Sequence, residues 1–462
     1  MKLKSIITAG ILIAGMSSCG EAFFEQYPSN NITEGNYYQT DDDFNQGVAS
    51  CYDKLKTQMA FHLSEIGYRS DENILESMAV STQDRYDIDN FAETPSNGIL
   101  SDIWNAWYNG IYRCNDVLDH MAGANIANYD KYRGECLFLR SWWYFNLYRV
   151  FGVVPIARTV VTPADAKLIP RCTDEEMYTL LTEDLAEAAR LLPPTPGAEK
   201  ARVANIAAYT LLAKVYLTFG KPAEAKVALE EAMKNTAYGL ESSTAKVFDV
   251  NNKMNKEIIF ALYYNKTNDN GHGYWYSTNT NVMADIRNPT PEFKAIYEEK
   301  DNRLALINTY TKISSNLYAM TKWYDTYDAT YTTQVGNDFP HLRYADVVLM
   351  YAEALAESGD GLGDALTWLN KTRTRAGLDE LTTDDVPDLA TFRQELANER
   401  GREFALEGHR WFDLVRLGLA IDHFRKMGYS LDAHNLIFPI PQNQIEIVNN
   451  SSILWQNPGF EQ

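Results

Sequence analysis

The amino-acid sequence predicts a mainly α-helical protein, in which paired helices stack into a scaffold that carries an irregular, loop-rich second lobe and a few short strands. Apolar residues recur every three or four positions over much of the chain, as they do on one face of a helix. Two stretches, 201–234 and 343–377, each repeat a helix–turn–helix plan. At 462 residues the chain is longer than one hydrophobic core usually grows, so we expect two lobes or one extended helical array.

Amphipathic helices are predicted in order along the first part of the chain. The first follows Thr40, an N-cap candidate with three aspartates directly behind it. The next two carry apolar stripes over 103–121 and 132–150. A fourth begins at "TDEE", where Thr173 and Glu176 have the spacing of a capping box.

The two repeated stretches predict helical hairpins that need neighbours. The stretch 201–234 has a Gly-Lys-Pro turn, and its length and its Ala, Tyr and Gly pattern look like a tetratricopeptide unit. Two such hairpins cannot cover their own apolar faces, so other helix pairs should stack on them. "EIIFALYY", 257–264, predicts a buried strand, whereas 62–98 and 265–340 predict long loops with short pieces of structure. Binding residues are often carried on such loops.

Charge and motifs exclude several classes of function. The net charge of −20 argues against nucleic acid, because a polyanion would be repelled. The sequence contains neither the HExxH spacing of a zinc protease nor a GxSxG nucleophile elbow. We expect no catalytic residue, metal or cofactor. A glycosidase carboxylate pair stays open, because such pairs meet only in three dimensions.

The first eighteen residues predict a lipoprotein signal peptide. Two lysines precede an apolar run, 6–16, that is too short to span a bilayer. The run ends at "GMSSC", where small residues stand directly before Cys19 as in a bacterial lipobox, although Met16 stands where leucine is commoner. We therefore expect a lipid on Cys19, with an ordinary secretory signal as the alternative.

The remaining cysteines show neither CxxC spacing nor the density of a disulfide scaffold. Cys51, Cys114 and Cys136 fall on predicted apolar helix faces, so we expect buried thiols there. The disulfide state of these three and of Cys172 stays open, because exported proteins can form disulfides.

The segment 398–418, "NERGREFALEGHRWFDLVRLG", combines many charged groups with Trp411 and Phe412 in one predicted helical run. Three acid–arginine pairs stand three residues apart: Glu399 with Arg402, Glu407 with Arg410, and Asp413 with Arg416. Because a buried charge persists only when it is paired, we interpret the segment as a structural ion-pair core. A substrate site is the alternative. His409 is expected to pack or to lie on the helix surface rather than to act as a base.

Four segments, in order, resemble signatures of the SusD/RagB family of outer-membrane nutrient-binding lipoproteins. They are "LFLRSWWYFNLYRVFGVVPI" (137–156), "LRYADVVLMYAEAL" (342–355), "ANERGREFALEGHRWFDLVRLG" (397–418) and "IFPIPQNQIEIVNNSSILWQNPGF" (437–460). "SDE" (70–72) and "WNAWYNGIYRCND" (104–116) fit as well. The resemblance spans nearly the whole chain after the signal peptide.

The resemblance implies a signal peptide over 1–18 and one SusD-like domain over 19–462. Such domains are tetratricopeptide-like helix pairs that form a superhelical scaffold with an irregular second lobe. Members of this family sit on the surface of Bacteroidetes as a hinged lid over a SusC-like TonB-dependent transporter, usually capturing glycan. The resemblance therefore implies an oligosaccharide or polysaccharide ligand, that transporter as partner, and a lipid anchor in the outer membrane.

The candidate ligand contacts combine rings with polar side chains in the predicted loops. A sugar offers an apolar C–H face to flat rings, and its hydroxyls to amide, carboxylate or guanidinium groups. The candidates are Tyr274, Trp275 and Tyr276 in 265–281, Trp323 and Tyr324 in 322–327, and Arg85, Tyr86 and Asp87 in 83–90. The alternative for each stretch is that its rings pack the loop onto the helices. Trp142, Trp143 and Trp411 are expected in the core.

We therefore expect a surface lipoprotein that binds oligosaccharide without cleaving it and passes it to an outer-membrane transporter. A peptide-binding lid of the same architecture is the first alternative, because the chain's acidity is compatible with it. A glycan-cleaving enzyme is a second alternative, and a general tetratricopeptide scaffold for protein partners is a third.

Overall fold

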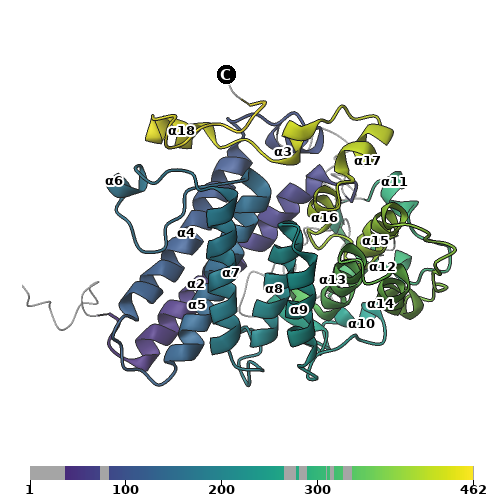
Figure 1. The fold of residues 1–462 in the computed structure, drawn as a ribbon, viewed down its shortest axis with the longest axis horizontal. Coiled ribbons are helices and arrows are strands. Elements are labelled where there is room, and N and C mark those ends of the chain that lie inside the picture. The colour runs from purple at the N-terminus through teal and green to yellow at the C-terminus, as the bar shows by residue number, and fades with distance from the viewer. Residues whose placement is uncertain are drawn as a thin grey trace, which may run out of the picture.

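The computed structural model describes residues 37–72, 83–264, 277–279, 289–308, 310–312, 317–325 and 336–460. Helices dominate this part of the chain, and the strands are few and short, as the sequence predicts (Figure 1).

The helices and strands follow one another in a simple order. The amino-terminal half contains α2 (Asp41–Ile66), η2 (Gly67–Arg69), α3 (Gln83–Asp89), α4 (Gly98–His120), α5 (Tyr129–Phe151), α6 (Pro163–Ala166), α7 (Asp174–Leu191), α8 (Asn205–Thr218), α9 (Pro222–Met233) and α10 (Thr244–Val247). The middle contains β1 (Ile258–Leu262), β2 (Ser277–Asn279), α11 (Pro291–Lys294), α12 (Leu304–Asn308), β3 (Tyr310–Lys312), β4 (Leu317–Met320), η4 (Thr321–Trp323) and β5 (Phe339–Arg343). The carboxyl-terminal part contains α13 (Tyr344–Glu357), α14 (Leu362–Arg375), α15 (Leu389–Glu403), α16 (Arg410–Arg416), α17 (Ala420–Lys426), η5 (Ala433–Leu436) and α18 (Gln442–Val448).

The long helices form a continuous row in which each packs on the next. Contacts run from α2 to α4, α5, α7, α8 and α9, and then from α9 to α13, α14 and α15 (Figure 1). The predicted hairpins are the pairs α8–α9 and α13–α14, which lie next to each other because α9 packs on α13. This stacking buries the apolar faces that neither hairpin could cover alone. The tetratricopeptide-like superhelical scaffold is confirmed.

Local signals in the sequence fix several helix ends. Thr40 and Thr173 both form capping boxes, with the side chains of Asp43 and Glu176 respectively. Each box satisfies backbone N–H groups that have no partner inside the helix. Gly152 ends α5 with a positive φ of 71°, a conformation that favours glycine.

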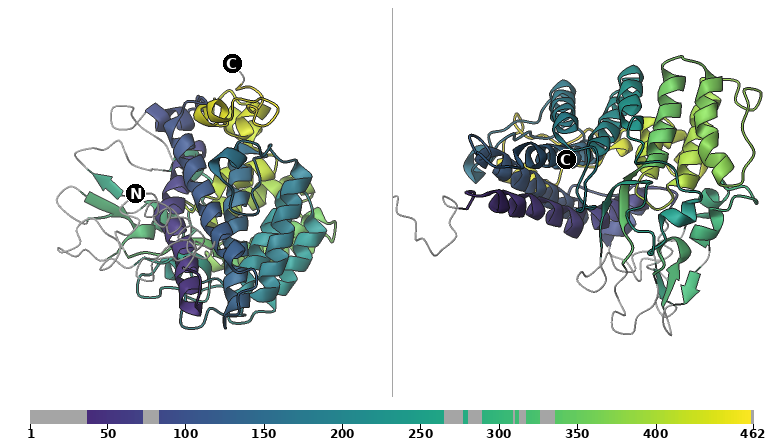
Figure 2. Two further views of the ribbon diagram at one scale, coloured as in Figure 1. Left: turned by 90° about the vertical axis from the view of Figure 1, so that its left-hand side faces the viewer. Right: turned by 90° about the horizontal axis from the view of Figure 1, so that it is seen from below.

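Two small sheets complete the described fold. Strands β1 and β5 pair antiparallel, and every residue of both is buried, which confirms the predicted strand in 257–264. A three-stranded sheet has the order β2–β4–β3. It projects from the helical body on the side of α2 (Figure 2). The loop-rich second lobe is therefore attached to one side of the helical scaffold.

Two sequence predictions are wrong in the described residues. The stretch 83–89, predicted as loop, forms helix α3, because Ile88 and Asp89 turn inward and Asp84 accepts a hydrogen bond from the Gly98 backbone at the start of α4. The run 398–418 is not one helix. It breaks between α15 and α16, where Leu406 and Gly408 have positive φ angles of 63° and 77°.

The core matches the predicted apolar stripes. Trp142, Trp143 and Trp411 are 3 %, 0 % and 2 % exposed, so the structure confirms their place in the core. The thiols of Cys51, Cys114 and Cys136 are buried and free, and so is that of Cys172. Among the helices of the described residues, none has the length and apolar character needed to cross a membrane.

The crossing of α4 and α5 generates a prediction about packing. A Cβ placed on Gly110 would lie 2.2 Å from the indole of Trp143, whereas a Cβ on Gly363 in α14 would meet no atom within 4 Å. We expect Gly110→Ala to lower the free energy of unfolding by about 3 kcal/mol through overpacking. Gly363→Ala, the matched control, should be neutral or stabilising by up to about 1 kcal/mol. Urea unfolding followed by circular dichroism measures both, and equal midpoints would contradict the prediction.

Candidate functional site

The loop 265–281, which carries three of the eight predicted ligand contacts, lies largely outside the described residues. Tyr274, Trp275 and Tyr276 belong to that part. The described strand β2 follows them directly and pairs with β4, with Thr278 opposite Tyr318. The other candidates lie on two separate elements, α3 and the segment that begins with η4.

The candidates Arg85, Tyr86 and Asp87 lie on helix α3, which packs on η2 and α4. Arg85 Nε donates a hydrogen bond to Glu65 Oε2 at 2.6 Å, which ties α3 to the end of α2. Tyr86 is half-buried against the core, and Asp87 accepts a hydrogen bond from Gln83 Nε2 at 2.6 Å. Arg85 therefore has a structural partner, while Tyr86 and Asp87 remain partly accessible.

Trp323 does not present its ring to solvent, which contradicts the expected role of this side chain. It is 3 % exposed, and its ring stacks on Phe339 with centroids 5.4 Å apart and an interplanar angle of 8°. Phe248 contacts it edge-on at 5.2 Å. The pattern of rings in 322–327 thus arises partly from packing. The neighbouring Tyr324 is half-buried.

A tyrosine that the sequence analysis did not single out stands two residues before the candidate loop in the sequence. Tyr263 follows β1, is 39 % exposed, and lines a pocket of about 480 Å³ together with Tyr52 and Arg202. The Lys253 ammonium lies 4.1 Å from the centroid of the Tyr263 ring. Tyr263 was not predicted as a ligand contact because it stands at the end of the predicted buried strand 257–264. The stretch 257–264 is apolar after Glu257 and β1 is buried on both faces, so no alternation in the sequence separates Tyr263 from its neighbours.

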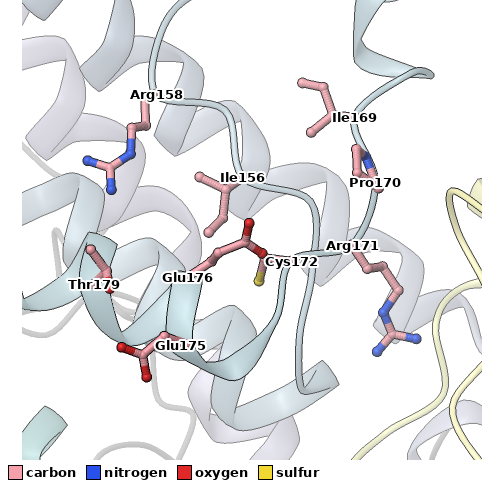
Figure 3. Close-up of a pocket in the computed structure, with 9 residues that line it drawn as sticks. All are labelled: Ile156, Arg158, Ile169, Pro170, Arg171, Cys172, Glu175, Glu176 and Thr179. Carbon is pink, nitrogen blue, oxygen red and sulfur yellow. The ribbon is translucent and has the colours of Figure 1, made fainter.

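A second pocket, of about 530 Å³, lies between α7 and the segment 156–172 (Figure 3). Its lining contains no aromatic ring. Two of its charged residues have structural partners, since Glu176 closes the capping box of α7 and Arg171 donates to the carbonyl oxygens of Val153 and Trp455. Figure 3 shows the Arg171 side chain pointing away from the two glutamates. This pocket lacks the flat surface on which a sugar ring stacks.

Buried ion pairs form the base of the second lobe. Arg343 Nη1, at the end of β5, lies 2.7 Å from Glu257 Oε1 and 2.8 Å from Glu403 Oε1. Arg303 Nη1, directly before α12, lies 3.0 Å from Glu403 Oε2. All four side chains are at most 1 % exposed. Glu403 on α15 therefore joins elements of the second lobe to the helical scaffold.

This network also anchors the segment that contains Trp323. Lys322 Nζ lies 2.7 Å from Glu407 Oε1, and Glu407 Oε2 accepts from Arg343 Nε at 2.8 Å. Burial lowers the pKa of Lys322, although Glu407 opposes that shift. For Glu403, burial alone would raise the pKa, but Arg375, Arg343 and Arg303 hold it well below its usual range.

The predicted ion-pair core is real, although one of its three pairs is wrong. Glu399 binds Arg402 at 3.0 Å, and Asp413 binds Arg416 at 2.9 Å, as the spacing predicts. Glu407 and Arg410 do not pair with each other, because the chain turns at Leu406 and Gly408, on either side of Glu407. Instead Glu407 binds Arg343 and Lys322, while Arg410 Nε lies 2.9 Å from Asp71 Oδ1. His409 packs on Phe404 with ring centroids 4.8 Å apart, as expected for a packing residue.

In the part of the chain that the structure describes, no group of three or more His, Cys, Asp or Glu side chains is arranged to hold a metal ion. What the described site offers is a scaffold with paired charges and a few partly exposed rings at its edge. Such a surface can bind a ligand by stacking and hydrogen bonding.

Comparison with known proteins identifies the family. A model described as "SusD family" matches residues 298–460, and one described as "Starch-binding associating with outer membrane" matches residues 22–217. The chain belongs to the SusD family. SusD-like protein P2 of Formosa agariphila is 26 % identical over 99 % of this chain and 100 % of its own length.

Solved SusD-like structures share the fold. One described as a laminarin-binding SusD-like protein superposes with a TM-score of 0.75 at 24 % identity, covering 91 % of this chain and 100 % of its own. Surface glycan-binding protein A of Bacteroides thetaiotaomicron, in complex with laminarihexaose, gives 0.74 at 22 % identity, with the same two coverages. The SusD fold thus accounts for the helical row and its attached lobe.

The ion-pair base generates a prediction about stability and pH. The pKa of Glu403 is lowered in the folded state. Ionised Glu403 therefore stabilises the fold at pH values above the glutamate pKa of the unfolded chain, about 4.3, and this stabilisation is lost as the pH falls. We expect Glu403→Gln to lower the free energy of unfolding by about 3–5 kcal/mol at pH 7, since it leaves buried arginines underpaired. The difference from the wild type should shrink below about pH 4.

The matched control is Glu395→Gln, on the same helix but only half-buried and in no ion pair with another described residue. Chemical denaturation between pH 3 and pH 8 measures both variants. A Glu403→Gln protein with the stability of the control at pH 7 would show that the network does not hold the lobe.

Proposed function

We propose that this SusD-family chain is a non-catalytic glycan-binding protein of the bacterial cell surface. The observation that carries the proposal is that the family models match both halves of the chain, while the whole fold superposes on a protein solved with an oligosaccharide. The helical scaffold supplies a rigid frame, and the loop-rich lobe supplies rings and polar groups at its edge.

The proposed contacts are rings that stack on sugar and polar groups that bind its hydroxyls. Tyr274, Trp275 and Tyr276 remain the main candidates, with Tyr86, Asp87 and Tyr324 beside them. We add Tyr263, because its ring is exposed and stands two residues before the loop 265–281. Arg85 is assigned to orienting α3 through Glu65, and Trp323 to the packing beneath the site.

The partner and the anchor are part of the same proposal. The lipobox at Cys19 would fix the mature protein to the outer membrane, facing the cell surface. A SusC-like TonB-dependent transporter would receive the glycan. The family description "associating with outer membrane" supports this placement. Each stacked ring adds roughly 1 kcal/mol beyond burial, so a few rings give weak binding, which suits cargo that must be released.

Calorimetry of the purified protein against a panel of polysaccharides, laminarihexaose and mixed peptides tests the proposal. We expect heat of binding with at least one glycan, none with the peptides, and no shortening of the glycan in chromatography of the same samples. Binding of peptides alone would favour the peptide-binding alternative, and shortened products would establish an enzyme.

A substitution series locates the site once a glycan has been found. Tyr274→Ala combined with Trp275→Ala should weaken binding on the order of thirtyfold, because two stacked rings are lost. Tyr263→Ala alone should weaken it about fivefold. Tyr112→Ala, which removes an exposed ring from α4, serves as the control and should leave binding unchanged. Full binding after the double substitution would remove the proposed loop.

A further inference from the structure

A separate pocket of about 330 Å³ lies between the end of α5, α8, α16 and the segment around Leu436. None of the residues proposed above for glycan binding lines it. Its lining includes three basic residues, Arg149, Lys214 and Arg416, and two acidic residues, Asp174 and Asp413. The volume lies at the lower end of the range found for small-molecule sites.

Arg149 is the unusual member of this lining. Its guanidinium lies between two rings, 3.9 Å from the centroid of Phe412 and 4.6 Å from that of Phe145. Of its five N–H donors, one binds Asn146 Oδ1, and within the described residues Nε is buried without a hydrogen-bond partner. The residue as a whole is partly exposed. Its guanidinium is thus held rigidly by rings while most of its donors are unused.

The nearby carboxylates already have other partners. Asp413 binds Arg400 at 2.8 Å and Arg416 at 2.9 Å. Asp346, behind the pocket wall, binds Arg400 and Lys214. In the described part of the chain no carboxylate oxygen lies within ion-pair distance of Arg149, and burial lowers the pKa of Arg149 to about 9.

Two other groups of the lining make no ion pair with Arg149 in the described residues. Asp174 accepts a hydrogen bond from the Tyr148 hydroxyl at 2.9 Å. His409 is neutral at pH 7, because burial and then the positive charge of Lys214 hold its pKa well below the usual range. Among the described residues, the Arg149 guanidinium is therefore a positive charge that no carboxylate contacts.

We propose that this pocket binds a small organic carboxylate, of monosaccharide size at most, whose carboxylate pairs with the Arg149 guanidinium. A planar carboxylate matches the fork of guanidinium donors and can accept two hydrogen bonds at once. One unpaired cation calls for a monoanion, because Asp174 and Asp413 would repel a second negative charge. The hydroxyls of Tyr148 and Thr218 lie on the same lining; they donate to Asp174 and to the Lys214 carbonyl oxygen, so they can accept hydrogen bonds from the ligand.

Calorimetry with three probes tests the pocket on the purified protein. Glucuronate should bind, whereas glucose, which has the same ring without the carboxylate, should not bind at this pocket. Acetate, which has a carboxylate but no sugar ring, shows whether the pocket recognises a uronate or any small carboxylate. Tighter binding of glucuronate than of acetate assigns the site to a uronate-like ligand, and equal binding assigns it to the carboxylate group alone. Absence of binding by both acids would overturn the proposal.

Two variants connect any binding to Arg149. Arg149→Met keeps an unbranched side chain between the rings and should weaken glucuronate binding about 10- to 100-fold, the value of a charged hydrogen bond. Arg158→Met, at an exposed arginine paired with Glu183, is the control and should bind like the wild type. Equal affinity of Arg149→Met and the wild type would overturn the proposal.

The melting temperature separates a ligand-binding role from a structural one. Without ligand, Arg149→Met should melt at the temperature of the wild type or above it, because it removes a buried charge that has no counter-ion. Added glucuronate should raise the melting temperature of the wild type but not that of the variant. A fall of several degrees in the unliganded variant would assign Arg149 to structure and contradict the proposal.

Discussion

A charge that is removed from water must meet an opposite charge, and this constraint organises the junction between the two lobes. Glu403 stands at the end of α15 and accepts from arginines that precede α12 and end β5. Each partner is nearly inaccessible, so none can exchange its protein contact for water. The direction of each guanidinium fork then fixes how the strands and short helices of the second lobe meet the helical row.

The helical row and the attached lobe have different kinds of cohesion. The row is held by apolar stripes and close crossings such as that of Gly110 with Trp143. The junction is held by directional polar contacts, which specify geometry more sharply than apolar packing does. The combination gives the second lobe a defined orientation on the helical row.

Much of the fold was predictable from local patterns, because a helix records its buried face and its caps in the sequence. Thr40, Thr173 and the two hairpins show this. Ion-pair partners were predictable only where the helix continued, as for Glu399 and Arg402. The predicted pair of Glu407 with Arg410 was wrong because Leu406 adopts a left-handed backbone conformation, which is uncommon for leucine and is not predictable from the residue type.

The sequence indicated that aromatic residues near irregular segments are the candidates for ligand binding, but it did not indicate which of these rings are exposed. Trp323 and Tyr263 are both aromatic residues near irregular segments, yet one stacks beneath the surface on Phe339 and the other is exposed. Which ring turns outward depends on strand pairing and on contacts distant in sequence. The pocket at Arg149 was hidden for the same reason, because the missing counter-ion is visible only after every nearby acid has been assigned a partner.

The pairing of β1 with β5 has an evolutionary consequence. Leu262 lies opposite Phe339, so the chain leaves the frame and re-enters it at one place. Apart from the parts that hold Arg303 and Lys322 in the ion-pair network, the segment between these two points can change in length at little entropic cost. Changes in the length of this segment can therefore arise in evolution while the helical row keeps its geometry.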